Sequence, residues 1–235
     1  HEPVRHSADD ETRRSGLAQT AVLAQLFSFL FWSAIMLLDR PLKLCRGPGN
    51  GVDQACLMTA TNMLIGCGDA GDAAVCTCEV LRDFIVRTND AMHWRTRRRL
   101  YGPLPWSLVG TRTTDSEVHR RRAEILVLSV SKMRELAIKD LRDGASLKAA
   151  HANKFSSFYC LNLSKKSKPE ERFGLYRCSV IEAARAASLY GAAANSGVPI
   201  WEACRDALVE AIAVGSKTPV ELKQTPEKLV AVLNG

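Results

Sequence analysis

The stretch TTDSEVHRRRAEILVLSVSKMRELAIKDLRDG, residues 113–144, decides the fold class of this chain. Thr113, Thr114 and Asp115 are residues that often cap helix N-termini, and Gly144 is typical of a helix end. Between them apolar residues recur every three or four positions, as on one face of a helix: Ile125, Leu126, Leu128, Met133, Leu136, Ala137 and Leu141. The stretch therefore predicts one long amphipathic helix that ends near Gly144.

The same spacing recurs after the glycine-rich segment Gly47–Gly51. It predicts helices near residues 57–65, 76–90, 180–195 and 199–212, the last two alanine-rich and paired as an antiparallel hairpin. Pro103 and Pro105 forbid a continuous helix over the segment from Arg95 to Pro105. Alanine supplies much of the 46% apolar fraction, which favours helices over sheets. We expect an all-α domain of about five to seven helices over residues 51–235, with residues 1–50 as an N-terminal extension.

An apolar segment without charged residues, 17–38, lies in this extension. About 20 such residues suffice to cross a bilayer, so the segment predicts either a membrane anchor or a buried hairpin helix. The first methionine is Met36, and translation starting there would make residues 1–35 upstream sequence. Cysteines that fall within apolar helical patterns, rather than in loops, favour free thiols in a reducing cytoplasm. We expect a cytoplasmic protein, with membrane anchoring as the alternative.

Three short motifs precede the long helix in fixed order. They read ACLMTA at 55–60, CTCEVL at 76–81 running on to Asn89-Asp90, and LVGTR at 108–112. This order resembles a family of small bacterial and bacteriophage proteins, common in actinobacteria, that has no assigned activity. The resemblance covers about residues 51–216, closely at the front and loosely behind. It implies no substrate, cofactor or partner, so any function has to be argued from the residues.

Three polar residues in these motifs are candidates for catalysis: Asn89, Asp90 and Arg112. Each also has a structural interpretation, because Asn-Asp can cap a helix end and arginine can bind carbonyls or a carboxylate. The chain contains no GxSxG, HExxH, P-loop or GxGxxG pattern, so the sequence predicts no cofactor.

Four of the eight cysteines lie within 23 residues and are candidate zinc ligands: Cys56, Cys67, Cys76 and Cys78. Only Cys76 and Cys78 have a short spacing, and on a helix their side chains would point about 200° apart. They could share an ion only if Cys76 preceded the helix. A cysteine nucleophile would instead need a histidine base, and three are available: His93, His119 and His151.

Most of the net charge of +7 is concentrated between His93 and Arg122, where eight arginines accompany two acids. The candidate polyanion-binding residues are Arg95, Arg97, Arg98, Arg99, Arg120, Arg121 and Arg122, which lie near Trp94, Tyr101 and Trp106. Arginine beside aromatic residues is typical of phosphate and base recognition, although such runs also occur as solvated faces. The sequence thus predicts a non-enzymatic helical binding or accessory protein for nucleic acid, another polyanion or a protein partner. The alternatives are a small enzyme with a site near Asn89, Asp90 and Arg112, and a protein anchored in the membrane through residues 17–38.

Overall fold

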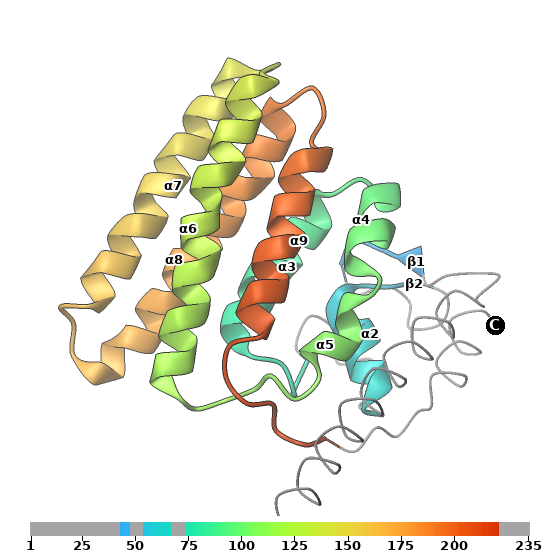
Figure 1. Cartoon of the computed structure of the whole chain (residues 1–235), viewed down its shortest axis with the longest axis vertical. Coiled ribbons are helices and arrows are strands. Elements are labelled where there is room, and N and C mark those ends of the chain that lie inside the picture. Colours follow the sequence, from blue (N-terminus) through green and yellow to red (C-terminus); the bar gives the residue numbers. More distant parts are fainter. Residues whose placement is uncertain (1–42, 48–53, 67–73, 221–235) are drawn as a thin grey trace, which may run out of the picture. The chain divides into compact units, whose positions relative to one another are not determined.

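The structure, a computed structural model, describes residues 43–47, 54–66 and 74–220, which Figure 1 shows in colour. All of them belong to one compact unit beginning at Leu42. Residues 43–47, expected in the extension, belong to this unit, and their short strand pairs with residues 54–55. Three features of the sequence lie outside the described residues: the apolar segment 17–38, the possible start at Met36, and Cys67. Among the helices that are described, none is long and apolar enough to span a bilayer.

Eight helices and one pair of two-residue strands make up the described part of the chain. In chain order the elements are β1 (Lys43–Leu44), β2 (Gln54–Ala55), α2 (Leu57–Leu64), α3 (Glu79–Ala91), α4 (Trp94–Tyr101), α5 (Leu104–Leu108), α6 (Ser116–Lys139), α7 (Gly144–Ser164), α8 (Pro169–Ala193) and α9 (Val198–Ile212). The all-α prediction is confirmed. The count exceeds the expected five to seven because the proline-containing segment forms two short helices, and Pro105 lies in the first turn of α5, where proline is tolerated.

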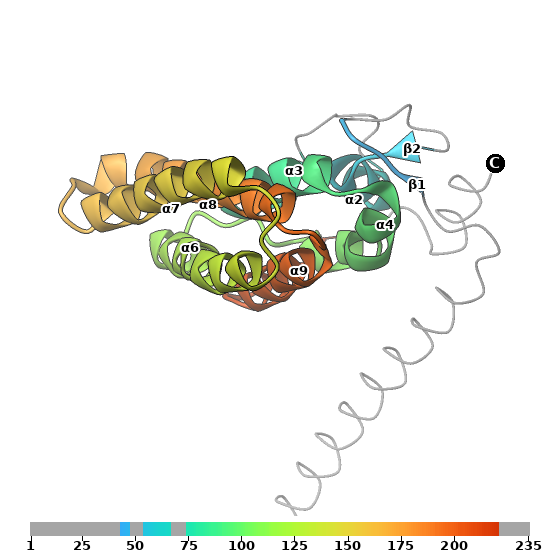
Figure 2. The ribbon, with the colours of Figure 1, turned by 90° about the horizontal axis from the view of Figure 1, so that it is seen from above.

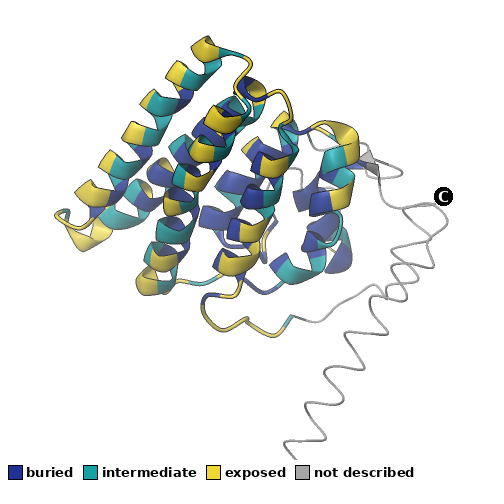
Figure 3. Cartoon of the chain, turned by 45° about the horizontal axis from the view of Figure 1, so that its top comes forward, coloured by how far each residue is buried: buried dark blue, intermediate teal, exposed yellow. Residues whose placement is uncertain are grey.

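The long helices form two layers, which Figure 2 shows edge-on. One layer contains α7, α8 and α3, and the other contains α6 and α9. The layers join where α6 packs against α8, and α9 packs beside α6. The short helices α2, α4 and α5 lie together at one end of the molecule, on the far side of α9 from α6 (Figure 1). Buried residues lie where these helices face one another, and exposed residues lie on the outer faces (Figure 3).

Helix α6 begins as predicted but ends early. The carboxylate of Asp115 accepts the first backbone N–H groups of the helix at 2.8 and 3.4 Å. The helix ends at Lys139, so the predicted stop at Gly144 is wrong. Gly144 is instead the first residue of α7, because Asp143 caps that helix by accepting the N–H of Ala145 at 2.9 Å. The pair Asp-Gly therefore marks the start of a second helix.

Helix α8 is longer than predicted, since it begins at Pro169 rather than near Val180. Its alanine face is buried and lets neighbouring backbones come close: Ala183, Ala184, Ala186, Ala187 and Ala193. Helices α8 and α9 are joined by four residues and contact each other, as the predicted hairpin requires. Their main partners differ, however, because α8 packs chiefly against α7 and α9 packs chiefly against α6.

Arg122 of α6 is fully buried and binds three backbone carbonyls. Its Nη1 donates to Thr111 O at 2.7 Å, its Nη2 to Val214 O at 2.8 Å and its Nε to Ala211 O at 3.2 Å. Ala211 and Val214 lie at the C-terminal end of α9, where the helix dipole places partial negative charge. The guanidinium therefore stabilises that helix end and joins it to α6 and to the segment that precedes α6.

We predict that Arg122→Met lowers the free energy of unfolding by about 3 kcal/mol or more, because three buried carbonyls lose a charged donor. Urea unfolding followed by circular dichroism measures this change. The matched control is Arg121→Met, at an exposed neighbouring position, which should change stability by less than about 0.5 kcal/mol. Equal effects of the two substitutions would contradict the structural role of Arg122.

Candidate functional site

Two of the three sequence motifs meet at the start of α3. The hydroxyl of Thr111 accepts the backbone N–H of Cys78 at 3.2 Å and donates to Leu108 O at 2.8 Å. The backbone N–H of Arg112 donates to Cys76 O at 2.9 Å. These contacts join the LVGTR segment to the residues that open α3, so both motifs have a structural role.

The other polar and glycine positions of LVGTR are also explained by contacts. Gly110 has φ of +75°, and a Cβ atom there would lie 2.3 Å from the carbonyl oxygen of Thr218. The exposed guanidinium of Arg112 donates to Val75 O at 2.9 Å. Arg112 therefore binds a backbone carbonyl, which is the structural role that the sequence allows as the alternative to catalysis.

Asn89 and Asp90 lie at the other end of α3, where they hold the chain that follows β1. The Nδ2 group of Asn89 donates to Cys45 O at 3.0 Å and to Asp90 Oδ1 at 3.0 Å, and Asp90 Oδ1 also accepts the N–H of Gly47 at 3.2 Å. The buried Oδ1 of Asn89 has no hydrogen-bond partner within the described residues. About ten residues of helix, or roughly 15 Å, separate this pair from the end of α3 that contacts Arg112. The structure therefore does not bring the three catalytic candidates together.

One cysteine does contact a histidine. Cys78, the N-cap residue of α3, hydrogen-bonds through its side chain to His119 of α6 and to Arg122. Burial by itself would raise the pKa of the Cys78 thiol, but these hydrogen bonds and the positive charge of Arg122 outweigh it and leave the pKa lowered. Cys78 and His119 are both buried, and the ring of His119 lies 4.7 Å from that of Phe173. The contact thus lies in the core between α3 and α6.

The candidate zinc ligands have separate local roles. Both Cys76 and Cys78 precede the first residue of α3, which is the geometry that a shared ion would require. Cys56 instead caps α2, where its Sγ accepts the N–H of Thr59 at 3.3 Å. Over residues 43–47, 54–66 and 74–220 no group of three or more His, Cys, Asp or Glu side chains is arranged to hold a metal ion.

A pocket of about 640 Å³ lies at the start of α4. Its walls come from the end of β1 and the residues after it, the end of α3 and the first turns of α4: Leu44, Cys45, Arg46, Met92, His93, Trp94, Arg97 and Arg98. We call it the α4 pocket. It combines apolar side chains with three arginines and contains no carboxylate among its described lining residues.

The buried Arg97 holds the α4 pocket together and was wrongly expected at the surface. Its Nε donates to Asn89 O at 2.7 Å, its Nη2 to Met92 O at 2.7 Å and its Nη1 to Leu44 O at 3.2 Å. The first two carbonyls lie at the C-terminal end of α3, which again favours a cation. Burial lowers the pKa of Arg97 and the nearby charge of Arg46 lowers it further, while the carboxylate of Asp90, outside the pocket walls, opposes this shift in part. The pocket therefore has like charges close together.

The remaining arginines of α4 differ in how far their charge is neutralised. Arg99 forms an ion pair with Glu202 at 3.0 Å. The guanidinium of Arg95 lies 5.1 Å from the ring centre of Trp94. Arg98 is partly exposed and pairs with no carboxylate of the described residues. Arg98 thus faces the pocket as an unneutralised cation.

The arginines of α6 contribute less than the sequence predicted. Arg120 is neutralised by Glu117 and Glu124, one turn before and after it, which offsets the unfavourable position of a cation near a helix N-terminus. Arg122 is buried, so it too is removed from the expected polyanion-binding surface. Only Arg121 remains exposed without an ion pair in the described structure. Helix α9 lies between α6 and α4 in both ribbon views, so the seven arginines do not form one surface (Figures 1 and 2).

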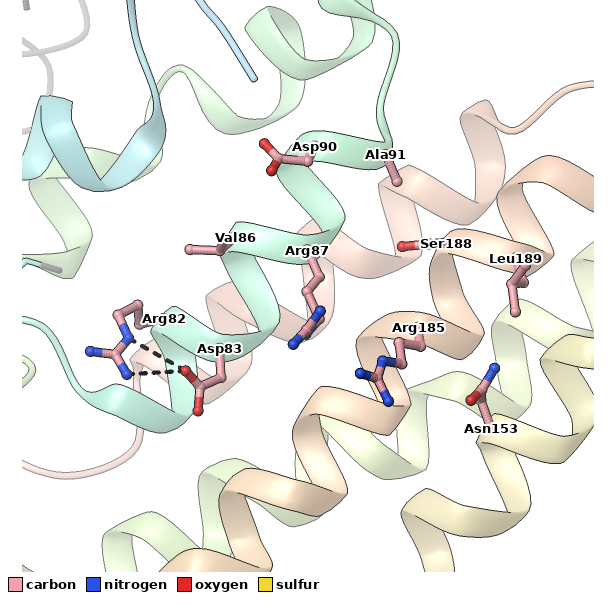
Figure 4. Close-up of a pocket in the computed structure, with 10 residues that line it drawn as sticks. All are labelled: Arg82, Asp83, Val86, Arg87, Asp90, Ala91, Asn153, Arg185, Ser188 and Leu189. Atoms are coloured by element: carbon pink, nitrogen blue, oxygen red, sulfur yellow. Dashed lines mark hydrogen bonds and ion pairs between the residues drawn. The ribbon is translucent and has the colours of Figure 1, made fainter. Parts of the chain in front are cut away.

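A second, larger pocket of about 840 Å³ lies between α3 and α8, with Asn153 of α7 at its edge (Figure 4). We call it the α3–α8 groove. Asp83 pairs here with Arg82, and with Arg177 at 2.7 Å, so part of its charge is compensated internally. Arg87 is exposed and pairs with no described carboxylate, and the carboxylate of Asp90 points away from it (Figure 4). The groove is therefore less positive than the α4 pocket but adjoins it at the end of α3.

In comparisons with known proteins, no family model, curated protein or solved structure matches the chain. The resemblance to a bacterial and bacteriophage family stays a prediction.

Arg46 is the pocket residue that the sequence analysis missed. It lies outside the arginine-rich window, just before the glycine-rich segment, and reaches α4 only because residues 43–44 pair with residues 54–55. A two-residue strand pair has no sequence signal of its own. The only available hint was a basic residue beside an apolar pair, Leu44-Cys45.

His151 of α7, a candidate base, is placed away from the cysteines that were considered as nucleophiles. Its Nε2 accepts a hydrogen bond from Arg134 Nε at 3.0 Å, and its ring meets the edge of Tyr190 at 5.9 Å. Burial lowers the pKa of His151, and the charges of Arg134 and Lys154 lower it further. His151 is therefore held as a neutral acceptor.

This environment predicts a pH dependence of stability. Because the folded protein binds the His151 proton less readily than the unfolded chain, the unfolded state takes up more protons as the pH falls through about 6.5. The contribution of His151 to the free energy of unfolding is therefore full above about pH 6.5 and decreases below that pH. Unfolding midpoints in urea between pH 7.5 and pH 5 should fall less steeply for His151→Gln, which keeps an acceptor for Arg134, than for the unmodified protein. Identical slopes for the variant and the unmodified protein would show that His151 does not titrate as described.

Proposed function

We propose that this protein is a non-enzymatic binding protein that holds an anionic group of a polyanion in the α4 pocket. The observation that carries this proposal is the set of cations around the pocket, Arg46, Arg97 and Arg98, without a carboxylate among its described walls. Cations that are not neutralised within the protein raise the local concentration of anions and can neutralise them on contact.

The type of cation favours phosphate or sulfate groups as ligands. A guanidinium presents paired N–H donors that match the oxygens of such groups, and it stays charged at any physiological pH. Arg97 uses its donors on carbonyls, so Arg46 and Arg98 are the two residues with donors to offer a ligand. An anion bound between them would also reduce the repulsion between Arg46 and Arg97.

The other functions considered have less support. A small enzyme near Asn89, Asp90 and Arg112 lacks a shared site, because the hydrogen bonds of these residues fix them at opposite ends of α3. Cys78 and His119 are in contact, but neither lines the α4 pocket or the α3–α8 groove. Anchoring in a membrane depends on residues 17–38, which are not described.

We predict that Arg46→Gln combined with Arg98→Gln weakens binding to heparin and lowers its salt dependence. Losing two charge contacts should reduce the slope of log affinity against log salt concentration by about 1.5. Affinity measured by titration at several salt concentrations gives this slope.

The matched control is Lys132→Gln combined with Lys139→Gln, which removes the same net charge from exposed positions on α6. If this control weakens heparin binding as much as the pocket variant does, the α4 pocket is not the binding site. If the unmodified protein does not bind heparin or nucleic acid at all, the proposed function is wrong.

A further inference from the structure

We propose that the α4 pocket binds a nucleotide of single-stranded nucleic acid, with the base stacked on Trp94 and the adjoining phosphate held by Arg46 and Arg98. This inference rests on the proposed function and adds the class of ligand. The proposed ligand is a strand with unpaired bases. Preferential binding of a polyanion without bases, or of a duplex, would contradict it.

Trp94 supplies the stacking surface. It is 50% exposed even though it is the first residue of α4 and lies against the pocket. The ring of His93 lies 5.7 Å from it, tilted by 41°, and Arg95 lies over its ring. An exposed indole beside arginines is the combination on which proteins stack unpaired bases, because every base presents a π face.

The apolar walls of the pocket favour a ligand that carries more than charge. Leu44 and Met92 are buried side chains that line the pocket together with Trp94. A sulfated sugar chain presents mostly hydroxyl and sulfate groups, whereas a base presents a flat aromatic face to these walls. The volume of about 640 Å³ lies within the range common for small-ligand sites, roughly 300–1,000 Å³.

The unpaired state of the strand follows from the geometry of stacking. In a duplex each base is already covered above and below by its neighbours, so its face is not available to Trp94. Unpaired strands can turn a base outward onto an aromatic side chain. The pocket therefore selects a single strand over a duplex of equal charge.

A strand longer than one nucleotide would extend from the α4 pocket toward the α3–α8 groove. The last two residues of α3, Asp90 and Ala91, line the α3–α8 groove, and the next two residues of the chain, Met92 and His93, line the α4 pocket, so a strand leaving the pocket has a short path to the groove. Arg87 in that groove is exposed and pairs with no described carboxylate (Figure 4). Further phosphates of the strand would contact this arginine, and Arg87→Gln should lower the salt slope by about 0.7.

The test compares two fluorescein-labelled strands of the same length, about 12 nucleotides: oligothymidine, and an abasic strand with the same phosphates. We expect the protein to bind oligothymidine about fivefold to tenfold more tightly than the abasic strand, because one base stacks on Trp94. Trp94→Ala should remove this difference and leave the salt slope unchanged. Trp94→Phe should keep most of it. Fluorescence anisotropy at several salt concentrations measures both quantities.

The matched control is Tyr159→Ala, which removes another exposed aromatic side chain, 60% exposed, from α7. It should leave both affinities unchanged, and thermal unfolding of each variant checks that the fold is kept. Equal binding of oligothymidine and the abasic strand, or tighter binding of a duplex of equal charge, overturns this inference but leaves polyanion binding in place. If the protein binds neither strand and does not bind heparin, both this inference and the proposed function are overturned.

Discussion

Two buried guanidinium groups hold this helical protein together by binding carbonyls at helix ends. Arg122 joins the end of α9 to α6 and Thr111, and Arg97 joins the end of α3 to α4 and Leu44. Neither has a carboxylate partner in the described structure. The desolvation of each charge is offset by three charge-assisted hydrogen bonds and, for both, by the negative end of a helix dipole. Removal of either donor would leave several carbonyls in the core without a partner, so the layers and the α4 pocket both depend on these two residues.

Local features of the fold could be predicted from the sequence, and long-range ones could not. The start of α6 follows from Asp115 and from apolar spacing, both of which act within one or two turns. The partner of α8 depends on which neighbour its alanine face meets, and a run of small residues fits several. Arg122 could have been found, because it shares the buried stripe of α6 with His119, Ala123 and Leu126. The run of three arginines, Arg120 to Arg122, suggests surface charge, but consecutive residues of a helix point in different directions and only Arg122 points inward.

The candidate site was predicted in part. The arginines and tryptophan near residue 95 predict an anion-binding region, and Trp94 and Arg98 both line the α4 pocket. Arg46 was missed because a strand pair of two residues brings it there, and Arg97 was misassigned because one face of an eight-residue helix gives too short a pattern to show which arginine points inward. The contact of Cys78 with His119 spans about forty residues of sequence and could not be inferred from the order of the motifs.

The bonds of Arg122 have a consequence for how the chain reaches its folded state. They connect positions 89 and 92 residues apart, whereas the sulfur atoms of Cys160 and Cys178, 3.3 Å apart on α7 and α8, are separated by only 18 residues. Closing the larger loop loses more chain entropy before any contact compensates for it. The α7–α8 hairpin can thus form early from contacts near in sequence, while the contact between α6 and α9 forms only after α9 has been made and has packed beside α6.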